Sequence, residues 1–226
     1  MREDFSRYAD RAQAGRVLAR DLGHYAERPD VLVLGLPRGG VPVAAEISKA
    51  LNVPFDILVV RKLGAPGQEE LAMGAIAGGG VRVINQDVVR MMGLSEDDLE
   101  RAVQSELHEL ERREGAYRGS HAPPMIHGRT VILADDGLAT GSTMRAAIKA
   151  VRAQGAAHIV VAIPVGAPRS CADLAALVDE VVCPHQPPNM GAISMWYEDF
   201  PQTPDQEVKA LLAERPHYGH DRHSKA

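Results

Sequence analysis

The sequence predicts an α/β domain, built from a mostly parallel β-sheet flanked by helices. Short continuous apolar runs alternate with amphipathic segments along the 226 residues. This alternation is typical of strands that are buried on both faces and joined by helices. Aromatic residues make up only 4% of the chain, so we expect a core of small branched side chains. We place a single domain at residues 1–214 and a polar, flexible tail at 215–226.

The elements of the first half follow from periodicity and from proline and glycine. In order, we predict a helix over 5–22, a strand over 31–35, a helix from about 42 to 51, and strands over 55–60 and 81–85. The first helix has apolar residues along one face, and Pro42 suits the first turn of the second. The strands VLVLG and FDILVV are almost wholly apolar. A glycine-rich stretch from Gly64 to Gly80 separates the second and third strands.

A long polar helix is predicted over residues 95–118 as an insertion in the domain. Ser95 and Asp98 form a capping-box signature, and a narrow apolar stripe follows at helical spacing. A helix this polar packs along one seam and leaves its other faces in water. A solvated outer helix is the simpler interpretation; an arm that covers a site or meets a second subunit is the alternative.

The second half continues the alternation. In order, we predict a strand over 130–134, a helix from about 142 to Gly155, a strand over 158–165, a helix over 169–178, a strand over 180–184 and a final helix through Leu212. Met144, Ala147, Ile148 and Val151 give the first of these helices its apolar face. Thr203 and Gln206, with Pro204 between them, resemble the cap of the last helix.

Charge and composition exclude some classes of function. With 25 Lys and Arg against 30 Asp and Glu, the formal net charge is −5. This balance argues against a protein that mainly binds nucleic acid or an anionic membrane. The apolar runs are too short to cross a bilayer, and the charged N-terminus is not a signal peptide. We therefore expect a cytoplasmic protein in which Cys171 and Cys183 are small core residues without a disulfide.

The segment VILADDGLATGST at 131–143 carries most of the functional information. A buried strand ends in Asp135 and Asp136, and a loop rich in glycine and hydroxyl side chains leads into a helix. Such a loop can bind an anion through backbone N–H groups and the positive end of the helix dipole. The two carboxylates suit sugar hydroxyls or a hydrated Mg²⁺. The alternative is an ordinary acidic turn, because the loop is no Walker A motif and GLPRGG at 35–40 does not match G-x-G-x-x-G.

This segment resembles the 5-phosphoribosyl-1-pyrophosphate (PRPP) motif of type I phosphoribosyltransferases, which has hydrophobic residues, two acids and a Gly/Thr-rich loop. GLPRGG has the place of the pyrophosphate loop of that family. The stretches VRKLGAPGQEELAMGAI at 60–76 and WYEDF at 196–200 resemble a bacterial branch of predicted phosphoribosyltransferases. The resemblance extends over roughly residues 5–212. It implies the fold of that family, with a Rossmann-like core and a small hood, here the segment 184–204.

The resemblance also implies a reaction and a set of roles. A nitrogenous base replaces the pyrophosphate of PRPP at C1′, with Mg²⁺ as cofactor. Asp135 and Asp136 would hold the ribose hydroxyls and the metal, and Gly137, Leu138, Ala139, Thr140, Gly141, Ser142 and Thr143 would bind the 5′-phosphate. The pyrophosphate would meet Pro37, Arg38, Gly39, Gly40, Arg61 and Lys62. Of these, Asp135, Asp136, Arg38 and Lys62 would be catalytic, and Gly64–Gly80 would be a mobile loop that closes over the reaction.

The resemblance leaves the acceptor base open. Hypoxanthine-guanine-type members have an aspartate at the position of Ala139, so a 6-oxopurine loses its best support here. Glu69 and Glu70 are possible proton acceptors or ordinary loop charges. Trp196 and Tyr197 in the hood are candidate base-binding residues, with a hydrophobic plug as the alternative for Trp196. The partners implied are PRPP, pyrophosphate and a base or nucleotide, and we expect a homo-oligomer, a dimer.

Two other functions use the same residues. A non-catalytic regulatory protein would bind PRPP or a nucleotide and signal through a partner. A phosphohydrolase would use the acids and Mg²⁺, but no persuasive nucleophile is present. Zinc is not expected, because Cys183 and His185 lack a second matching pair of ligands.

Overall fold

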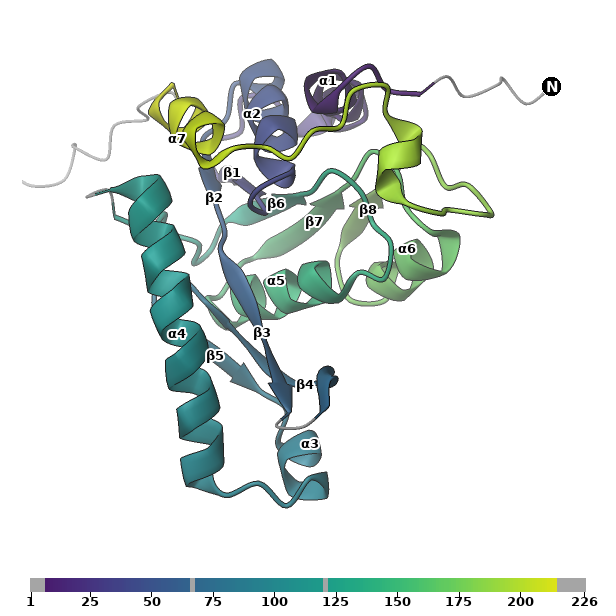
Figure 1. The fold of residues 1–226 in the computed structure, drawn as a ribbon. Helices are drawn as coiled ribbons and strands as arrows, with labels where there is room; N and C mark the ends of the chain where they lie inside the picture. The colour runs from purple at the N-terminus through teal and green to yellow at the C-terminus, as the bar shows by residue number, and fades with distance from the viewer. Residues whose placement is uncertain (1–6, 66–67, 120–121, 215–226) are drawn as a thin grey trace, which may run out of the picture.

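The central sheet has five strands, all parallel, in a computed structural model that describes residues 7–65, 68–119 and 122–214. Their order across the sheet is β2 (Phe55–Ile57), β1 (Val31–Gly35), β6 (Thr130–Ala134), β7 (His158–Ala162) and β8 (Glu180–Val182). Helices lie on both faces of this sheet (Figure 1). The predicted α/β class, a mostly parallel sheet flanked by helices, is therefore confirmed.

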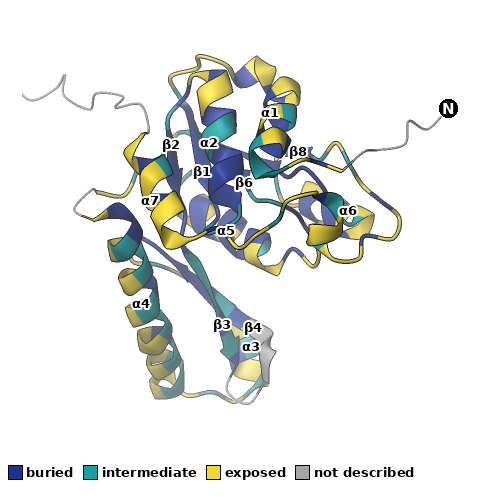
Figure 2. Cartoon of the chain, turned by 45° about the horizontal axis from the view of Figure 1, so that its top comes forward, coloured by how far each residue is buried: buried dark blue, intermediate teal, exposed yellow. Residues whose placement is uncertain are grey.

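Successive side chains of the core strands point to opposite faces of the sheet and pack against the helices on each face. On one face, Val31 and Val33 join a hydrophobic cluster with α1 (Arg11–Asp21), α2 (Gly40–Leu51) and α7 (Asp205–Ala213). On the other face, Leu32 and Leu34 join a cluster with α5 (Ser142–Ala153) and α6 (Pro168–Ala175). The strands β1 and β6 are buried along their whole length, which is why they are continuous apolar runs in the sequence (Figure 2).

A second, antiparallel sheet stands beside the core. It consists of β3 (Val60–Ala65), β4 (Gln68–Ala77) and β5 (Val81–Ile84). The predicted strand 55–60 is therefore two strands that belong to different sheets. The stretch Gly64–Gly80, expected to be a mobile loop, is mostly strand, apart from residues 66–67, which lie outside the described part. Strand β4 pairs with β3 on one side and with β5 on the other, so most of this stretch is held in a sheet.

The long helix α4 (Glu96–Arg118) runs along the second sheet (Figure 1). Ser95 and Asp98 form the predicted capping box. The buried residues Val103, Leu110 and Tyr117 follow one another at seven-residue steps, so the helix packs by one seam, and its outer face is exposed (Figure 2). A short helix, α3 (Gln86–Met91), was not predicted, although the side chain of Asn85 caps it by accepting from two backbone N–H groups.

The ends of several elements differ from prediction. Helix α1 begins after Asp10, whose carboxylate accepts from the backbone N–H of Gln13, and the part of the predicted helix before residue 7 lies outside the described residues. Helix α7 begins after Pro204, so Thr203 is not its cap. The described residues also include two short 3₁₀-helices, η1 (Gly23–Tyr25) and η2 (Ile193–Trp196). In the described part of the chain, no helix has the length and apolar character needed to span a membrane.

Candidate functional site

The candidate site lies where β1 and β6 end. The two strands are neighbours and pair in parallel, with Gly35 opposite Ala134, so the loops that follow them leave the sheet at the same edge. The backbone N–H of Leu36 donates to the carbonyl oxygen of Ala134 over 2.9 Å, which joins the two loops at their first residues. Both sequence segments singled out for phosphate chemistry therefore meet at one edge of the sheet.

Gly39 brings the two loops into direct contact. A Cβ atom at this position would lie 1.9 Å from the carboxylate oxygen Oδ2 of Asp136. Real Cβ atoms do not approach an oxygen so closely, so only glycine leaves room for the carboxylate in this arrangement. The acidic residue of one loop is thus seated against the backbone of the other.

The two adjacent carboxylates have different surroundings. Asp136 Oδ2 lies 2.8 Å from Arg11 Nε, whereas Asp135 Oδ1 accepts from the backbone N–H of Asp136 over 2.9 Å. Burial raises the pKa of Asp135, and so does the neighbouring charge of Asp136. Burial also raises the pKa of Asp136, while the ion pair with Arg11 opposes that increase. Asp136 is thus held by an arginine, whereas no guanidinium among the described residues pairs with Asp135 in this way.

Arg11 is the residue of the site that sequence reasoning missed. Besides its ion pair with Asp136, it donates through Nη1 to the carbonyl oxygen of Pro201 over 2.7 Å. Its guanidinium carbon lies 3.7 Å from the centre of the Phe200 ring, a cation–π contact. Arg11 therefore ties helix α1 and the segment after η2 to the acidic loop. No local pattern indicates this, because 125 residues separate Arg11 from Asp136.

The loop 137–141 leads into α5 in the form expected of an anion site. Gly141 precedes the helix with φ of 74°, a left-handed conformation that favours glycine, and no side chain caps the first turn. The loop is fixed from behind, because Leu138 exchanges backbone hydrogen bonds with Val165 and Ala167. Thr140, Ser142 and Thr143 supply hydroxyl groups in and just after the loop. A helix N-terminus with hydroxyl side chains in its first turn can bind a phosphate group.

The predicted cations lie on two different parts of the fold. Arg38 follows a cis peptide bond to Pro37, and its Nη1 lies 3.5 Å from Asp205 Oδ1. Arg61 and Lys62, expected just after the second core strand, instead lie within β3 of the second sheet. Arg61 Nη2 lies 2.6 Å from Glu106 Oε2 of α4, an ion pair that joins the second sheet to this helix. Arg61 and Lys62 therefore follow β2 closely in the chain but belong to the second sheet, and their contact with pyrophosphate stays a prediction.

The two hood aromatics differ in exposure. The Tyr197 side chain is buried against the rings of Tyr8 and Phe200, and its hydroxyl donates to the carbonyl oxygen of Asp136 over 2.6 Å. Its ring has no exposed face for a base, so the direct base contact predicted for Tyr197 is corrected to support of the acidic loop. Trp196 is half-buried, and its Nε1 donates to Met190 O over 2.7 Å.

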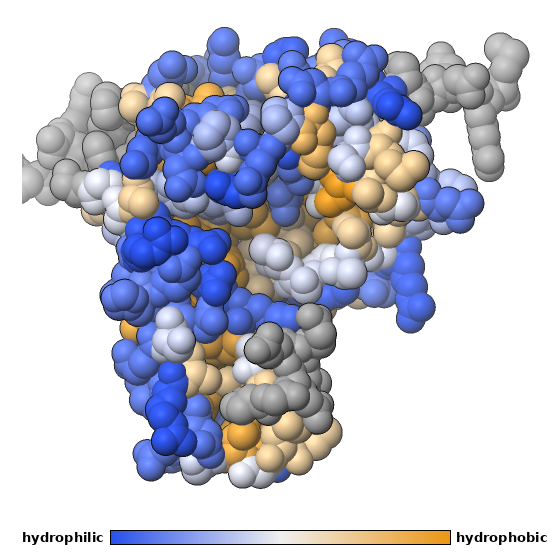
Figure 3. Space-filling model, in the orientation of Figure 1, coloured by the Kyte–Doolittle hydropathy of each residue, from blue (hydrophilic) through white to orange (hydrophobic). Residues whose placement is uncertain are grey.

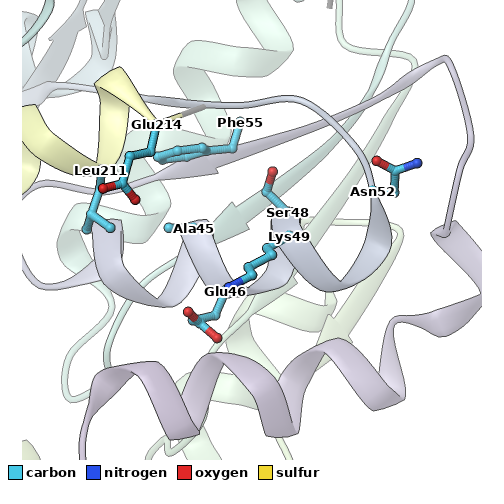
Figure 4. Close-up of a pocket in the computed structure, with 8 residues that line it drawn as sticks. All are labelled: Ala45, Glu46, Ser48, Lys49, Asn52, Phe55, Leu211 and Glu214. Carbon is cyan, nitrogen blue, oxygen red and sulfur yellow. The ribbon is translucent and has the colours of Figure 1, made fainter. Parts of the chain in front are cut away.

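Neither the metal-ligating groups nor the cavity between α2 and α7 competes with this edge. Among the residues that the structure describes, no cluster of three or more His, Cys, Asp and Glu side chains is placed to hold a metal ion. A cavity of about 380 Å³ lies between α2 and α7, with Phe55 in its wall (Figure 4). Glu46 and Glu214 line it beside a single lysine, Lys49, so it is poorly suited to a phosphate.

Comparison with known proteins agrees with this geometry. The family described as phosphoribosyl transferase domain matches residues 5–193. Two curated relatives from Mycobacterium tuberculosis, named "Putative phosphoribosyl transferase Rv0571c" and "Putative phosphoribosyl transferase MT0597", are each 46% identical over 205 residues. The match covers 91% of this chain and 46% of each relative, so the chain spans about half the length of the curated relatives it matches.

A solved structure is similar over almost its whole length. The crystal structure of TT1426 from Thermus thermophilus is 39% identical and superposes with a TM-score of 0.84, covering 92% of this chain and 98% of that one. The parallel core sheet and the loops at its carboxyl edge lie within the matched family region. The chain belongs to the phosphoribosyl transferase domain family.

Proposed function

We propose that this chain is a Mg²⁺-dependent phosphoribosyltransferase that transfers the 5-phosphoribosyl group of PRPP to a nitrogenous base. One observation carries the proposal: the loop of the acidic pair and the loop 36–39 meet at the carboxyl edge of the core sheet, with Asp136 seated against Gly39. This arrangement supplies the two kinds of groups that the ligand requires. The N-terminus of α5 suits the 5′-phosphate, and the carboxylates suit the ribose hydroxyls.

In this proposal each group at the edge has one task. The residues 137–143 bind the 5′-phosphate and fix the ribose relative to the acids. Asp135 and Asp136 accept hydrogen bonds from the 2′- and 3′-hydroxyls and favour the positive charge that grows on the sugar as the C1′–oxygen bond breaks. Arg11 orients the Asp136 carboxylate and opposes the increase in its pKa that burial causes. The loop 36–40 lies at the pyrophosphate end, and we retain Lys62 as a candidate cation there.

The donor set fits Mg²⁺. This ion is commonly bound by one or two carboxylates together with substrate oxygens and water, rather than by a complete cage of protein ligands. Asp135, with Asp136 beside it, would hold the ion together with oxygens of the ligand. When bound, it would neutralise negative charge on the pyrophosphate.

We place the acceptor base on the side of η2. Ile193 of this 3₁₀-helix packs directly against the acidic loop, since a Cβ atom at Gly137 would lie 2.6 Å from its side chain. Trp196, in the same short helix, is half-buried and is the candidate for stacking on a planar base. The nitrogen of the base would attack C1′, its lone pair would form the new bond, and the bonding electrons would leave with the pyrophosphate.

Release of pyrophosphate from PRPP and Mg²⁺ tests the proposal. The full chain is incubated with a panel of purines, pyrimidines and other nitrogenous acceptors, and pyrophosphate is measured. We expect turnover with at least one acceptor, and loss of that turnover in the variant with Asp135→Asn and Asp136→Asn. Tight PRPP binding without turnover on a broad panel would contradict the enzyme and favour the regulatory alternative.

A further inference from the structure

A small pocket joins the predicted pyrophosphate loop to the long helix. Its wall combines the loop after β1 with the C-terminal end of α4 and the start of α7, through Arg38, Arg112, Arg113, Ala116, Tyr117 and Asp205. The surface at this end of α4 is strongly hydrophilic (Figure 3). Arg38 lines this pocket and also belongs to the loop at the carboxyl edge of the sheet, so it links the two.

Three guanidinium groups face this pocket. Arg112 and Arg113 come from successive positions of α4, and each lies 2.7 Å from a carboxylate oxygen of Glu109, one turn earlier. Asp205 accepts from the hydroxyl of Tyr117 over 3.0 Å, and its contact with Arg38 is long, at 3.5 Å. The three arginines therefore carry one more charge than the two carboxylates of Glu109 and Asp205 that contact them. Glu109 leaves N–H groups of both arginines available, because each guanidinium carries five donors.

The size of the pocket restricts the ligand. Its volume is about 170 Å³, whereas pockets for drug-sized molecules start at roughly 300 Å³. A whole nucleotide therefore does not fit, while a phosphate or pyrophosphate group does. Planar guanidinium groups match phosphate oxygens in pairs and retain their charge at any physiological pH.

We propose that this pocket holds the pyrophosphoryl group of PRPP, with Arg112 and Arg113 of α4 acting together with Arg38. The inference rests on the proposed function and adds a task for the inserted helix, which carries two of the three cations to the substrate. As the C1′–oxygen bond breaks, its electron pair passes to the pyrophosphate oxygen. The arginines stabilise the negative charge that develops there, and the base nitrogen supplies the pair for the new bond at C1′.

A double variant tests the inference. Arg112→Gln with Arg113→Gln removes both charges and keeps hydrogen-bonding side chains on an exposed helix surface. Arg101→Gln is the matched control, because Arg101 is an exposed arginine of the same helix with an ion pair one turn away, at 2.5 Å to Asp98. The dissociation constants of PRPP, free pyrophosphate, inorganic phosphate and ribose 5-phosphate are measured by calorimetry on the full chain with Mg²⁺.

We expect the double variant to bind PRPP and pyrophosphate about ten-fold or more weakly, as the loss of charge-assisted hydrogen bonds requires. Its affinity for ribose 5-phosphate should stay within about two-fold, and Arg101→Gln should leave all four ligands unchanged. Unchanged PRPP and pyrophosphate affinities would overturn the inference, and so would an equal loss for ribose 5-phosphate. A loss for inorganic phosphate alone would also overturn it, by assigning the pocket to a separate anion.

If the unaltered chain binds PRPP and the arginine variants bind it equally well, only the role of α4 is wrong. If the unaltered chain does not bind PRPP at all, the proposed function itself is wrong.

Discussion

The core sheet and the region built from the second sheet and α4 are stabilised in different ways. In the core, β1 and β6 are buried at every position, and apolar side chains pack on both faces. Along α4, only Val103, Leu110, Tyr117 and Arg118 are buried in 23 residues, and charged contacts fasten the helix at its C-terminal end and middle. The core holds the acidic pair and the loop 137–141 in place, whereas the outer helix α4 places Arg112 and Arg113 in a pocket with Arg38.

The largest expected effect concerns the attachment of α4 to the core. Arg118 and Asp56 form an ion pair at 3.0 Å with both side chains only 5% exposed, and Arg118 also donates to the carbonyl oxygen of Ile57. Arg118→Ala leaves Asp56 buried without this partner, so we expect a loss of about 3–5 kcal/mol in the free energy of unfolding. Urea denaturation measures it, and hydrogen exchange should show the loss first in α4.

A second variant separates charge from packing at this contact. Arg118→Met with Asp56→Asn removes both charges, and much of the lost stability should return because replacing both partners of a buried pair is far less costly than removing one. Equal stability of Arg118→Ala and the unaltered chain would contradict the view that this pair anchors the helix.

The acidic pair gives the next largest effect, on binding rather than on stability. Asp135→Asn with Asp136→Asn should weaken PRPP binding by about 3 kcal/mol or more, because the charge-assisted contacts to ribose and metal are lost. Stability should not fall, since burial raises the pKa of both carboxyls and thus opposes their charge in the folded chain. Calorimetry with PRPP and Mg²⁺ measures the loss, and an unchanged affinity in a folded variant would exclude these residues from the site.

A smaller effect is expected at Arg11, which joins the core site to the segment after η2. Arg11→Gln should weaken PRPP binding by about 1–2 kcal/mol, because Asp136 loses the partner that orients it. Arg11→Lys should recover part of the affinity, since the positive charge remains. The matched control is Arg16→Gln in the same helix, whose ion pair with Glu46 is on the surface. Equal losses for Arg11→Gln and Arg16→Gln would mean that helix α1 acts only through stability.

The smallest effect concerns Trp196. If its exposed face stacks on the base, Trp196→Phe should weaken nucleotide binding by about 1 kcal/mol and leave PRPP affinity unchanged. The fluorescence of this tryptophan should also change when a nucleotide binds. A variant that only lowers the melting temperature, with fluorescence that ignores every nucleotide tested, would make Trp196 a plug that fastens the C-terminal segment.

The core and its acidic loop were predictable because their signals are local. A buried parallel strand is a continuous apolar run, as at 31–35 and 130–134, and the capping box at Ser95 marks the start of α4. Of the second sheet, the strand over 81–85 was predicted as β5, whereas β3 and β4 were missed because they are defined by pairing with each other rather than by their own composition. Glycines at Gly64 and Gly74 indicated a loop, yet both residues are paired in the ladder between β3 and β4.

The charged contacts of the site were missed for the same reason. The partner of Asp136 is Arg11, and the arginines of α4 that line a pocket with Arg38 look like an exposed helix surface in the sequence. These residues are far apart in the sequence and meet only in the folded chain, so no local sequence pattern predicts their contacts. Asn85, by contrast, caps α3 by accepting from the backbone N–H groups of Asp87 and Val88, and an asparagine before a helix is a local signal in the sequence.

The structure of the chain in complex with PRPP and Mg²⁺, determined without a base, tests the central claim most directly. The account predicts the 5′-phosphate at the N-terminus of α5, the ribose hydroxyls at Asp135 and Asp136, and the pyrophosphoryl group between Arg38 and the C-terminal end of α4. PRPP bound elsewhere, such as in the cavity between α2 and α7, would contradict it, as would a ligand that leaves the acidic pair without contact.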